Sequence, residues 1–448
     1  MRTKPMFVRL IALFALLLPF PALAQDSGPI EVDVIGGQQA AQPVAVPQMV
    51  ARGPRMTPAG EIDALARNIS SVIASDLRST GAITPIGPVG IRPLRDGEVV
   101  NPDFNEWQNA GATALVAGYT EFAANGRLTV ACYLFDTVTG RELARQGFSV
   151  IPADWRRGAH KCADMVYARL TGEGAFLDTR IVYVAETGPK DARVKRIALM
   201  DSDGRNHRYL TEGQETVIKP RFSPDGSRLT YLSYKGRRPR VYVLDLATGN
   251  TRLLVPGTAF TFSASFSPDG RNIVFSMAEG GNTDIYVTRA DGSGSPRRLT
   301  TMPGVDTSPS FSPDGRSIVF ESDRSGSQQL YVMNADGTNQ RRISFGGGQY
   351  ADPSWSPLGN LIAFTKIGGG QFRIGVMSPA GGGERLLTSS WQDEGPSWAP
   401  NGQFVMFHRT RQGSGDASLY AVPVNGGEAR LMPTPLGGSD PSWSPLQN

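Results

Sequence analysis

The architecture of this chain follows from Phe311-Ser312-Pro313-Asp314-Gly315, which is continued after one residue by Ser317-Ile318-Val319-Phe320. Proline fixes φ at an early turn position and glycine accepts a positive φ at a later one, so the first segment predicts a tight turn. The β-branched and aromatic residues of the second segment are typical of a buried strand. Together they predict two antiparallel strands joined by a short hairpin.

The same unit, an aromatic residue followed by Ser-Pro or Ala-Pro, occurs six times. Its aromatic residues are Phe222, Phe266, Phe311, Trp355, Trp398 and Trp443, spaced 43 to 45 positions apart. This period is typical of the four-stranded blade of a β-propeller. A second glycine turn also recurs six times, at Gly204, Gly249, Gly292, Gly337, Gly381 and Gly426.

The two kinds of turn are offset along the chain. Gly204 has no aromatic motif before it, and Trp443 has no further strands after it. We therefore expect residues 179–218 to supply three strands of one blade and residues 439–446 to supply its fourth. This pairing closes the ring and leaves no sheet edge exposed at the seam. The sequence predicts an all-β, six-bladed propeller over residues 179–448, closed by its C-terminal strand.

Residues 25–170 lack this period and predict a compact α/β domain, joined to the propeller by a junction at 171–178. Thr57 and Pro58 are typical of a helix start, and apolar residues at helical spacing continue to a stop at Gly81. Further elements are expected as strands at 115–120, 128–136 and 141–150, and as a helix at 155–170.

The first 24 residues predict a cleaved secretory signal peptide. Arg2, Lys4 and Arg9 precede the apolar run at 10–20, and Ala22-Leu23-Ala24 forms a small-residue cleavage site. A signal anchor is the alternative, but eleven apolar residues are too few to cross a bilayer. We therefore expect an exported protein with no lipid anchor and no inserted segment.

Composition and charge limit the classes of partner. The 448 residues include 45 basic and 41 acidic side chains, a net charge of +4 with no long basic run. This balance and the predicted export argue against a nucleic-acid partner. Cys132 and Cys162 are the two cysteines. An oxidising compartment permits a disulfide between them, and two buried free thiols are the alternative that the sequence leaves open.

The end of the first domain resembles the domain junction of the TolB family. The matching segments are Ala163-Asp164-Met165-Val166-Tyr167, Leu170-Thr171-Gly172, Gly174-Ala175-Phe176 and Thr179-Arg180-Ile181-Val182-Tyr183-Val184. The resemblance implies a monomeric periplasmic adaptor between the outer-membrane lipoprotein Pal and the inner-membrane protein TolA. It also implies roles in envelope integrity and in outer-membrane constriction at division, with no cofactor and no catalytic residue.

The family places its TolA-binding segment at the mature N-terminus, either held against the protein or released. The corresponding residues here are Ile30, Glu31, Val32, Asp33, Val34 and Ile35, followed by Gly36-Gly37. Alternating apolar and acidic residues with glycines behind them suit a detachable strand that adds to the edge of a partner's sheet. An ordinary first strand of the α/β domain is the alternative.

The family places Pal on the propeller face where loops precede the aromatic-Ser-Pro strands. The candidate residues in those loops are Glu215, Phe260, Phe262, Asp306, Asp352, Asp393, Glu394 and Asp440. An acidic rim with two aromatic side chains could receive a basic and apolar patch of a partner. Acidic residues that merely solvate turns are the alternative. A divalent ion trapped by these carboxylates at the channel mouth is a further hypothesis.

The rival function is a propeller-associated hydrolase or lyase of the periplasm. A peptidase of this kind needs a Gly-x-Ser-x-Gly nucleophile elbow, and the sequence contains none. The histidines, His160, His207 and His408, are far apart and lack metal-ligand spacing. Asp201-Ser202-Asp203-Gly204 begins like a calcium loop but has the phase of a blade turn and lacks the downstream Glu. We therefore expect no enzyme.

Overall fold

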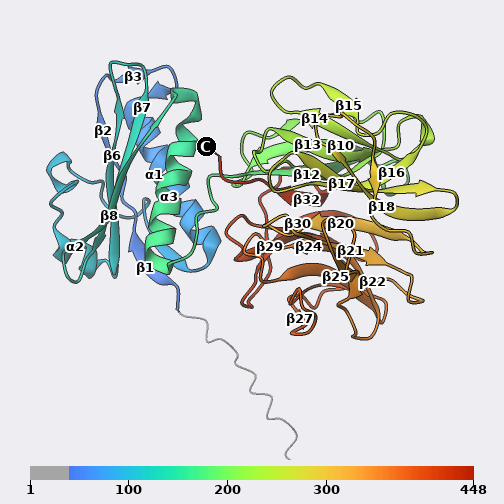
Figure 1. The fold of residues 1–448 in the computed structure, drawn as a ribbon. Coiled ribbons are helices and arrows are strands. Elements are labelled where there is room, and N and C mark those ends of the chain that lie inside the picture. The colour runs from blue at the N-terminus through green and yellow to red at the C-terminus, as the bar shows by residue number, and fades with distance from the viewer. Residues whose placement is uncertain (1–39, 448) are drawn as a thin grey trace, which may run out of the picture. The chain divides into compact units, whose positions relative to one another are not determined.

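The computed structural model describes residues 40–447 (Figure 1). The predicted leader and the predicted strand at residues 30–35 lie outside this part of the chain. Helices and a mixed sheet form residues 42–171, and six four-stranded sheets follow from residue 180. The predicted α/β region and six-bladed β-propeller are therefore confirmed.

The α/β region is a six-stranded sheet with two long helices packed on it. The strand order is β5-β1-β6-β7-β8, with β2 also paired to β6; the β1, β2, β5 and β6 pairings are parallel, whereas β7 and β8 are antiparallel additions. Bounds are β1 (Gln42–Ala45), β2 (Val50–Arg52), β5 (Ile83–Ile86), β6 (Ala114–Phe122), β7 (Leu128–Asp136), β8 (Glu142–Val150), α1 (Ile62–Thr80) and α3 (Trp155–Thr171). Short elements are β3 (Met56–Thr57), β4 (Gly60–Glu61), α2 (Phe104–Asn109) and two 3-10 turns, Asp96–Glu98 and Pro152–Asp154.

Helix α1 begins later than the sequence predicts. Thr57 belongs to the two-stranded turn β3-β4, where its hydroxyl donates to the carbonyl of Gly60, and the helix begins at Ile62. The Thr-Pro pair therefore starts a turn, and the predicted cap at Thr57 is wrong. The predicted stop is confirmed: Gly81 takes the left-handed conformation with φ 73°, and its N–H donates to the carbonyl of Arg78.

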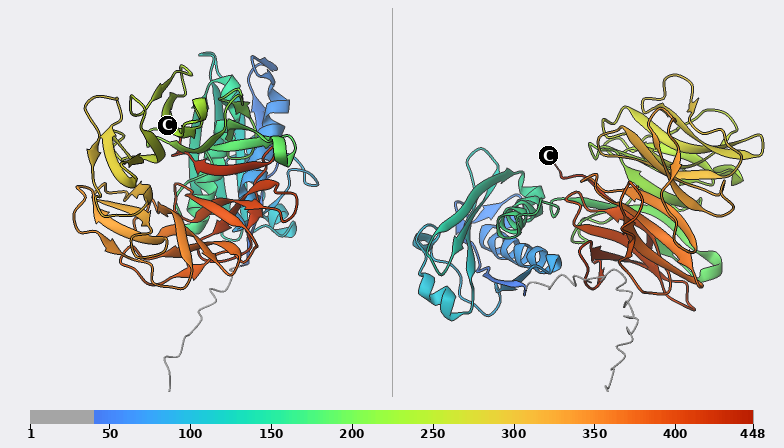
Figure 2. Two further views of the ribbon diagram at one scale, coloured as in Figure 1. Left: turned by 90° about the vertical axis from the view of Figure 1, so that its right-hand side faces the viewer. Right: turned by 60° about the horizontal axis from the view of Figure 1, so that its bottom comes forward.

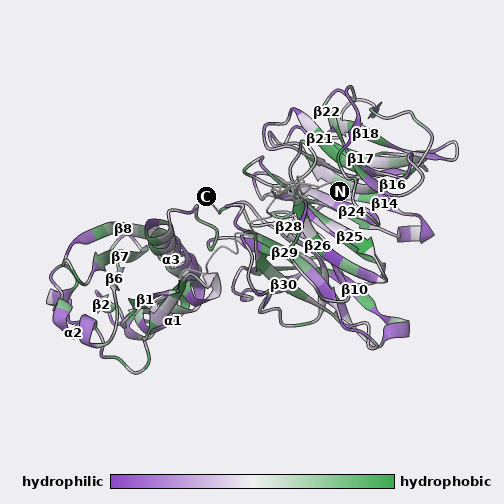
Figure 3. Ribbon diagram, turned by 90° about the horizontal axis from the view of Figure 1, so that it is seen from below, coloured by the Kyte–Doolittle hydropathy of each residue, from purple (hydrophilic) through white to green (hydrophobic). Residues whose placement is uncertain are grey.

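A disulfide joins the sheet to helix α3. Cys132 on β7 and Cys162 on α3 are fully buried and bonded, with 6.0 Å between their Cα atoms. Of the two alternatives that the sequence left open, the structure contains the disulfide. The bond fixes α3 on the sheet, where buried apolar residues of both helices join the core. Figure 3 shows that α1 and α3 contain both hydrophilic and hydrophobic residues.

The propeller consists of six blades, numbered here from the first along the chain. Blade 1 contains β9 (Arg180–Thr187), β10 (Val194–Asp201), β11 (Arg208–Tyr209) and β32 (Gly438–Trp443); a 3-10 turn, Lys190–Ala192, joins β9 to β10. Blade 2 contains β12 (Val217–Phe222), β13 (Arg228–Ser233), β14 (Arg240–Asp245) and β15 (Thr251–Leu253), with a 3-10 turn at Lys235–Arg237. Blade 3 contains β16 (Phe260–Phe266), β17 (Asn272–Glu279), β18 (Asn282–Arg289) and β19 (Arg297–Arg298).

The remaining three blades repeat this plan. Blade 4 contains β20 (Asp306–Phe311), β21 (Ser317–Ser322), β22 (Gln329–Asn334) and β23 (Arg341–Arg342). Blade 5 contains β24 (Gln349–Trp355), β25 (Ile362–Gly368), β26 (Gln371–Met377) and β27 (Arg385–Leu386). Blade 6 contains β28 (Asp393–Trp398), β29 (Phe404–Thr410), β30 (Ala417–Pro423) and β31 (Arg430–Leu431).

The C-terminal strand β32 completes blade 1. It pairs antiparallel with β9, with Trp443 opposite Ile181 and Ser439 opposite Val184. In Figures 1 and 2 this red strand lies beside the green strands of the first blade. The arrangement is the one that the offset between the two kinds of turn predicts. The innermost strand of blade 1 therefore comes from the opposite end of the propeller sequence.

Repeated aromatic residues fill the space between blades. Phe275, Phe320, Phe364 and Phe407 lie at equivalent positions on the second strands of blades 3 to 6, and all are fully buried. Phe320 stacks on Tyr331 of the next strand, with ring centroids 5.7 Å apart. Full burial of each such ring stabilises the fold by about 2 to 3 kcal/mol. The core of the propeller is thus built from the same residue in successive repeats.

The junction between the two regions is ordered by one buried carboxylate. Asp164 on α3 accepts hydrogen bonds from the backbone N–H groups of Phe176, Leu177 and Asp178. The ring of Phe176 then packs 5.0 Å from Phe404 of blade 6. Asp164 and Phe176 lie in the segments that resemble the TolB junction, so these contacts give a physical reason for that part of the sequence pattern.

Candidate partner-binding surface

The six innermost strands surround the centre of the propeller, and each is bulged at its middle. Neighbouring inner strands contact one another around the whole ring. The bulged residues are Lys219, Ser263, Ser308, Asp352, Gly395 and Asp440, all with positive φ. Five of these six are not glycine, so the backbone holds a conformation that L residues rarely adopt. The bulges bring their polar side chains and backbone to the ring centre.

An ion pair crosses the centre of the ring. Lys219 Nζ on β12 lies 2.6 Å from Asp352 Oδ1 on β24. These strands belong to blades 2 and 5, which are three blades apart in a ring of six and therefore opposite one another. The small cavity beside the pair, about 90 Å³, is lined by residues from five inner strands. The middle of the propeller is therefore spanned by a lysine and an aspartate.

A second carboxylate supports this pair. Glu321 on β21 accepts hydrogen bonds from the hydroxyl of Ser308 at 3.1 Å and from the N–H of Asp352 at 2.9 Å. Burial and the neighbouring charge of Asp352 raise the pKa of Glu321 to about 7. Burial opposes the charge of Lys219, but Asp352 and Glu321 hold the pKa of its ammonium above the usual range. Lys219 thus supplies the cation for both carboxylates.

Two of the predicted rim residues lie inside their blades. Asp306 and Asp393, the first residues of β20 and β28, are both fully buried. Asp306 pairs with Arg324 at 2.5 Å, and Asp393 binds Arg409 through two hydrogen bonds of 2.7 and 3.0 Å. These charges hold the start of each inner strand against its neighbour. They shape the rim without offering a free carboxylate to a partner.

The other predicted rim residues are more accessible. Phe260 is 43% exposed, whereas Phe262 is half-buried against the core of blade 3. Glu215, Glu394, Asp352 and Asp440 are half-buried. Glu394 lies 2.8 Å from Gln392 and 3.8 Å from His408, and His408 Nδ1 accepts the N–H of Asp440 at 3.4 Å. The structure therefore brings acidic groups of blades 6 and 1 together at one side of the rim.

Exposed apolar side chains gather in the same loops, and of these the sequence predicted Phe260 but not the others. We call this set the apolar ring, and its members are Phe260, Met302, Val305, Phe345, Trp391 and Leu436, exposed by 37 to 73%. They lie at the ends of the loops that lead into the inner strands of blades 3, 4, 5, 6 and 1. Because every repeat delivers this loop to the same end of the ring, the apolar side chains gather at one face. Their shared phase in the repeat was the available sequence signal.

Hydrogen bonds and a ring contact brace the loops of the apolar ring. The carbonyl of Met302 accepts from the side chain of Asn282 at 3.2 Å, and that of Trp391 accepts the N–H of Phe372 at 3.0 Å. The guanidinium of Arg342 lies 5.2 Å from the ring of Phe345. A braced loop loses less conformational freedom when a partner binds, which favours affinity.

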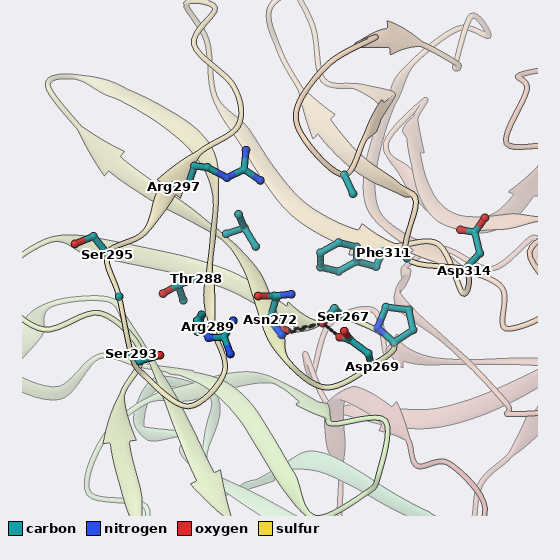
Figure 4. Close-up of a pocket in the computed structure, with 15 residues that line it drawn as sticks. Ser267, Asp269, Asn272, Thr288, Arg289, Ser293, Ser295, Arg297, Phe311 and Asp314 are labelled. Atoms are coloured by element: carbon teal, nitrogen blue, oxygen red, sulfur yellow. Dashed lines mark hydrogen bonds between the residues drawn. The ribbon is translucent and has the colours of Figure 1, made fainter.

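The opposite end of the blades carries a different cavity, of about 530 Å³, between blades 3 and 4 (Figure 4). One of its three serines, Ser267, donates to Asp269 at 2.5 Å and accepts the N–H of Asn272 at 2.9 Å, the bonds dashed in Figure 4. Ser312 makes the same contact with Asp314 at 2.5 Å one blade later. This is the bonding of a repeated turn, and neither serine has a histidine as its base.

Two of the described histidines, His207 and His408, make structural contacts within and between blades. His207 packs near Tyr183 and Tyr209, with ring centroids 6.0 and 5.2 Å away, and burial lowers its pKa. His408 serves as an acceptor between blades 6 and 1. Among residues 40–447, no helix is long and apolar enough to cross a membrane.

Comparison with known proteins identifies the family. A model described as the TolB amino-terminal domain matches residues 30–143, and one described as the TolB beta propeller domain matches residues 167–447. The chain belongs to the TolB family. The resemblance first seen in residues 163–184 is thereby confirmed.

Relatives from several bacteria match almost the whole chain. The Tol-Pal system protein TolB of Rhizorhabdus wittichii is 55% identical, with 97% of each chain covered. That of Zymomonas mobilis is 53% identical, covering 93% of this chain and 91% of the relative. The crystal structure of TolB from Acinetobacter baumannii superposes with a TM-score of 0.77 at 26% identity, covering 91% of this chain and 97% of that one.

Proposed function

We propose that this chain is a periplasmic, non-enzymatic adaptor of the Tol-Pal system that links the outer-membrane lipoprotein Pal to the inner-membrane protein TolA. In this role it supports envelope integrity and outer-membrane constriction during cell division. Its relatives are named Tol-Pal system proteins. The observation that carries the proposal is the apolar ring, a braced hydrophobic surface at one end of a rigid propeller.

Pal binds, in this proposal, at the end of the propeller that carries the apolar ring. Exposed aromatic side chains, Phe345 at 73% and Trp391 at 39%, are of the kind that dominates binding energy at interfaces. The half-buried carboxylates Glu215, Glu394 and Asp440 add negative charge beside them. A partner surface with apolar side chains and basic groups would complement both features, the first for affinity and the second for steering.

The predicted aspartates that are paired with basic side chains have a supporting role in this proposal. Asp306 and Asp393 fix the inner strands through Arg324 and Arg409, and Asp352 fixes the ring centre through Lys219. A surface whose supports are already ordered loses little entropy on binding. The rim would therefore bind as a preformed surface.

TolA binds, in this proposal, through the N-terminal segment Ile30, Glu31, Val32, Asp33, Val34 and Ile35, which lies outside the described residues. Its alternating pattern suits addition to the edge of a sheet. We propose residues 1–24 as a cleaved leader, 25–170 as the α/β domain that carries this strand, 171–178 as the junction and 179–448 as the propeller.

A hydrolase or lyase activity has weaker support. The cavity in Figure 4 offers Ser267 with an aspartate that belongs to a repeated turn. At the ring centre, Asp352 is paired with Lys219, and Glu321 accepts hydrogen bonds from Ser308 and from the N–H of Asp352. Neither arrangement combines a free base with room for a substrate beside it.

The test is a pull-down with the exported protein and tagged soluble domains of Pal and TolA. The mature chain should recover both partners, whereas a chain that begins at Gly36 should recover Pal and lose TolA. The control for surface substitution is Val138→Ala. Val138 lies in the α/β region and is 71% exposed. Equal recovery of TolA by the full and shortened chains would contradict the strand proposal, and hydrolysis by the purified protein would contradict the adaptor.

A further inference from the structure

An arginine recurs at one position on the outermost strand of every blade. The six are Arg208, Arg252, Arg297, Arg341, Arg385 and Arg430, spaced 44 or 45 residues apart and in the same register with the third strand. In blades 2 to 5 the guanidinium donates to a backbone carbonyl in the outer turn of the next blade. Arg297, for example, donates to the carbonyl of Asp336 at 3.1 Å.

At blade 6 this arginine contacts the α/β region instead. Arg430 donates to the carbonyl of Ser79, at the C-terminal end of α1, with a distance of 2.9 Å. Its guanidinium lies against Gly81, where any side chain would overlap it. A cation at a helix C-terminus is also favoured by the helix dipole. Helix α1 therefore takes the place that a blade turn occupies elsewhere in the ring.

Because Arg430 contacts α1, it does not bond to the outer turn of blade 1. Helix α3 contacts that turn instead. Arg156 forms an ion pair with Asp203 in the turn between β10 and β11. His160 lies one helical turn after Arg156 on α3 and is 1% exposed. Its Nδ1 lies 2.7 Å from Asp76 Oδ2 on α1, and its Nε2 lies 3.9 Å from Asp203 Oδ2. His160 thus stands between a carboxylate of the α/β region and one of the propeller.

The charges around His160 favour its protonated form. The charged groups near His160 come from three elements: Asp76 from α1, Arg156 from α3, and Asp201, Asp203 and Arg205 from blade 1. Asp178 at the junction is already paired with Arg157 and Lys161, at 3.2 and 3.1 Å. Burial opposes the imidazolium, but the nearby carboxylates Asp76 and Asp201 outweigh it and raise the pKa of His160.

The surroundings of the two ring nitrogens of His160 also agree with a protonated imidazole. Nδ1 already faces Asp76, and among the described residues Nε2 has no hydrogen-bond partner although it is buried. A proton on Nε2 would point to Asp203 and balance the second aspartate. Asp76, His160 and Asp203 are also of metal-binding types. Arg156 already occupies Asp203, so a metal ion would have to displace a buried guanidinium.

We infer that protonated His160 is a tie between helices α1 and α3 and blade 1 of the propeller, and that this tie loosens when the imidazole loses its proton. Arg430 and Ser79 form a second tie that contains no group titrating near neutral pH. The contribution of His160 is fully present below its unfolded pKa of about 6.5 and is lost as the pH rises through its raised folded pKa. Contact between the two regions therefore depends on the pH of the compartment.

The test is an NMR titration of the histidine side chains in the intact chain. His160 should titrate above the ordinary value, with both ring nitrogens protonated at pH 6, and Asp203→Asn should lower its pKa by at least half a unit. The variant Asp416→Asn, which changes an exposed carboxylate of the propeller, should leave it unchanged. A neutral imidazole at pH 6, or a pKa that does not respond to Asp203→Asn, would overturn the inference.

Hydrogen exchange tests the mechanical consequence. Protection factors of the last turn of α1 and of residues 176–178 should fall as the pH rises through the measured pKa of His160. The same residues in His160→Gln should show little pH dependence, and His408→Gln should behave like the unaltered chain. If His160→Gln does not fold, Asp203→Asn serves in its place. Unchanged protection across the titration, or a rise in protection on addition of Zn²⁺ alone, would contradict a proton-controlled tie.

Discussion

Lys219 and Asp352 join opposite blades across the centre of the propeller, with 2.6 Å between Nζ and Oδ1. Since each side chain is about one quarter exposed, at 26% and 24%, both lose much of their hydration. Removal of one partner leaves the other charge poorly solvated, which is more costly than the loss of an exposed pair.

The first prediction therefore concerns Lys219→Met. It should lower the free energy of unfolding by about 2 kcal/mol, because Asp352 and Glu321 lose their cation. The double variant Lys219→Met with Asp352→Asn should recover part of that loss. Urea unfolding of the three proteins measures both effects. A single variant as stable as the unaltered chain would show that the pair does not support the ring.

The second prediction is a pH dependence that arises from Glu321. Burial and Asp352 raise the pKa of its carboxyl from 4.5 to about 7, so the folded protein holds this proton more tightly than the unfolded chain. The contribution of Glu321 therefore favours folding below 4.5 and is lost as the pH rises towards 7. Glu321→Gln should remove a decline of about 3 kcal/mol over this range. Melting temperatures of both proteins between pH 4.5 and 7 provide the measurement, and parallel curves would contradict it.

The third prediction concerns the disulfide between Cys132 and Cys162. Reduction should lower the free energy of unfolding of the α/β region by about 3 kcal/mol, because the unfolded chain is no longer constrained. Thermal melts with and without dithiothreitol measure the change. The double variant Cys132→Ser with Cys162→Ser should melt at the temperature of the reduced protein and show no response to the reductant. If dithiothreitol lowered the melting temperature of the double variant, the effect of the reductant would not come from this disulfide.

The fourth prediction concerns the closure of the ring. Trp443 contacts Phe176 with ring centroids 6.0 Å apart and donates its Nε1–H to the hydroxyl of Thr179 at 2.8 Å. Trp443→Ala should therefore destabilise the propeller by about 3 to 5 kcal/mol. Trp443→Phe keeps most of the packing and should lose less. Thermal unfolding followed by near-ultraviolet circular dichroism compares the two, and equal losses would show that ring packing is not the cause.

The sequence predicted the propeller well because its signals are local and repeated. The Pro-Asp-Gly turns, the spacing of the aromatic residues and the offset of Gly204 against Trp443 are all short-range patterns. The predicted start of α1 was wrong because a Thr-Pro pair also suits a tight turn. In the structure, Thr57 belongs to the small hairpin β3-β4.

The rim was harder to predict because burial depends on cross-strand partners. Asp306 and Asp393 look like solvent-facing loop residues, but Asp306 pairs with Arg324 in the turn after β21, and Asp393 pairs with Arg409 on β29. Apart from Phe260, the residues of the apolar ring were not predicted, because single apolar residues in loops carry little signal until the fold places them at one face. The cluster of Asp76, His160 and Asp203 unites three distant segments, and only the tertiary structure shows it.

The proposed docking surface is tested most directly by the affinity of Pal for a variant of the apolar ring, measured by isothermal titration calorimetry. Phe345→Ala combined with Trp391→Ala should weaken binding at least tenfold, a loss of about 1.4 kcal/mol or more. Val138→Ala is the control and should bind as the unaltered chain does. An affinity for Pal unchanged by the double substitution, in a variant whose melting temperature is also unchanged, would contradict the proposed docking surface.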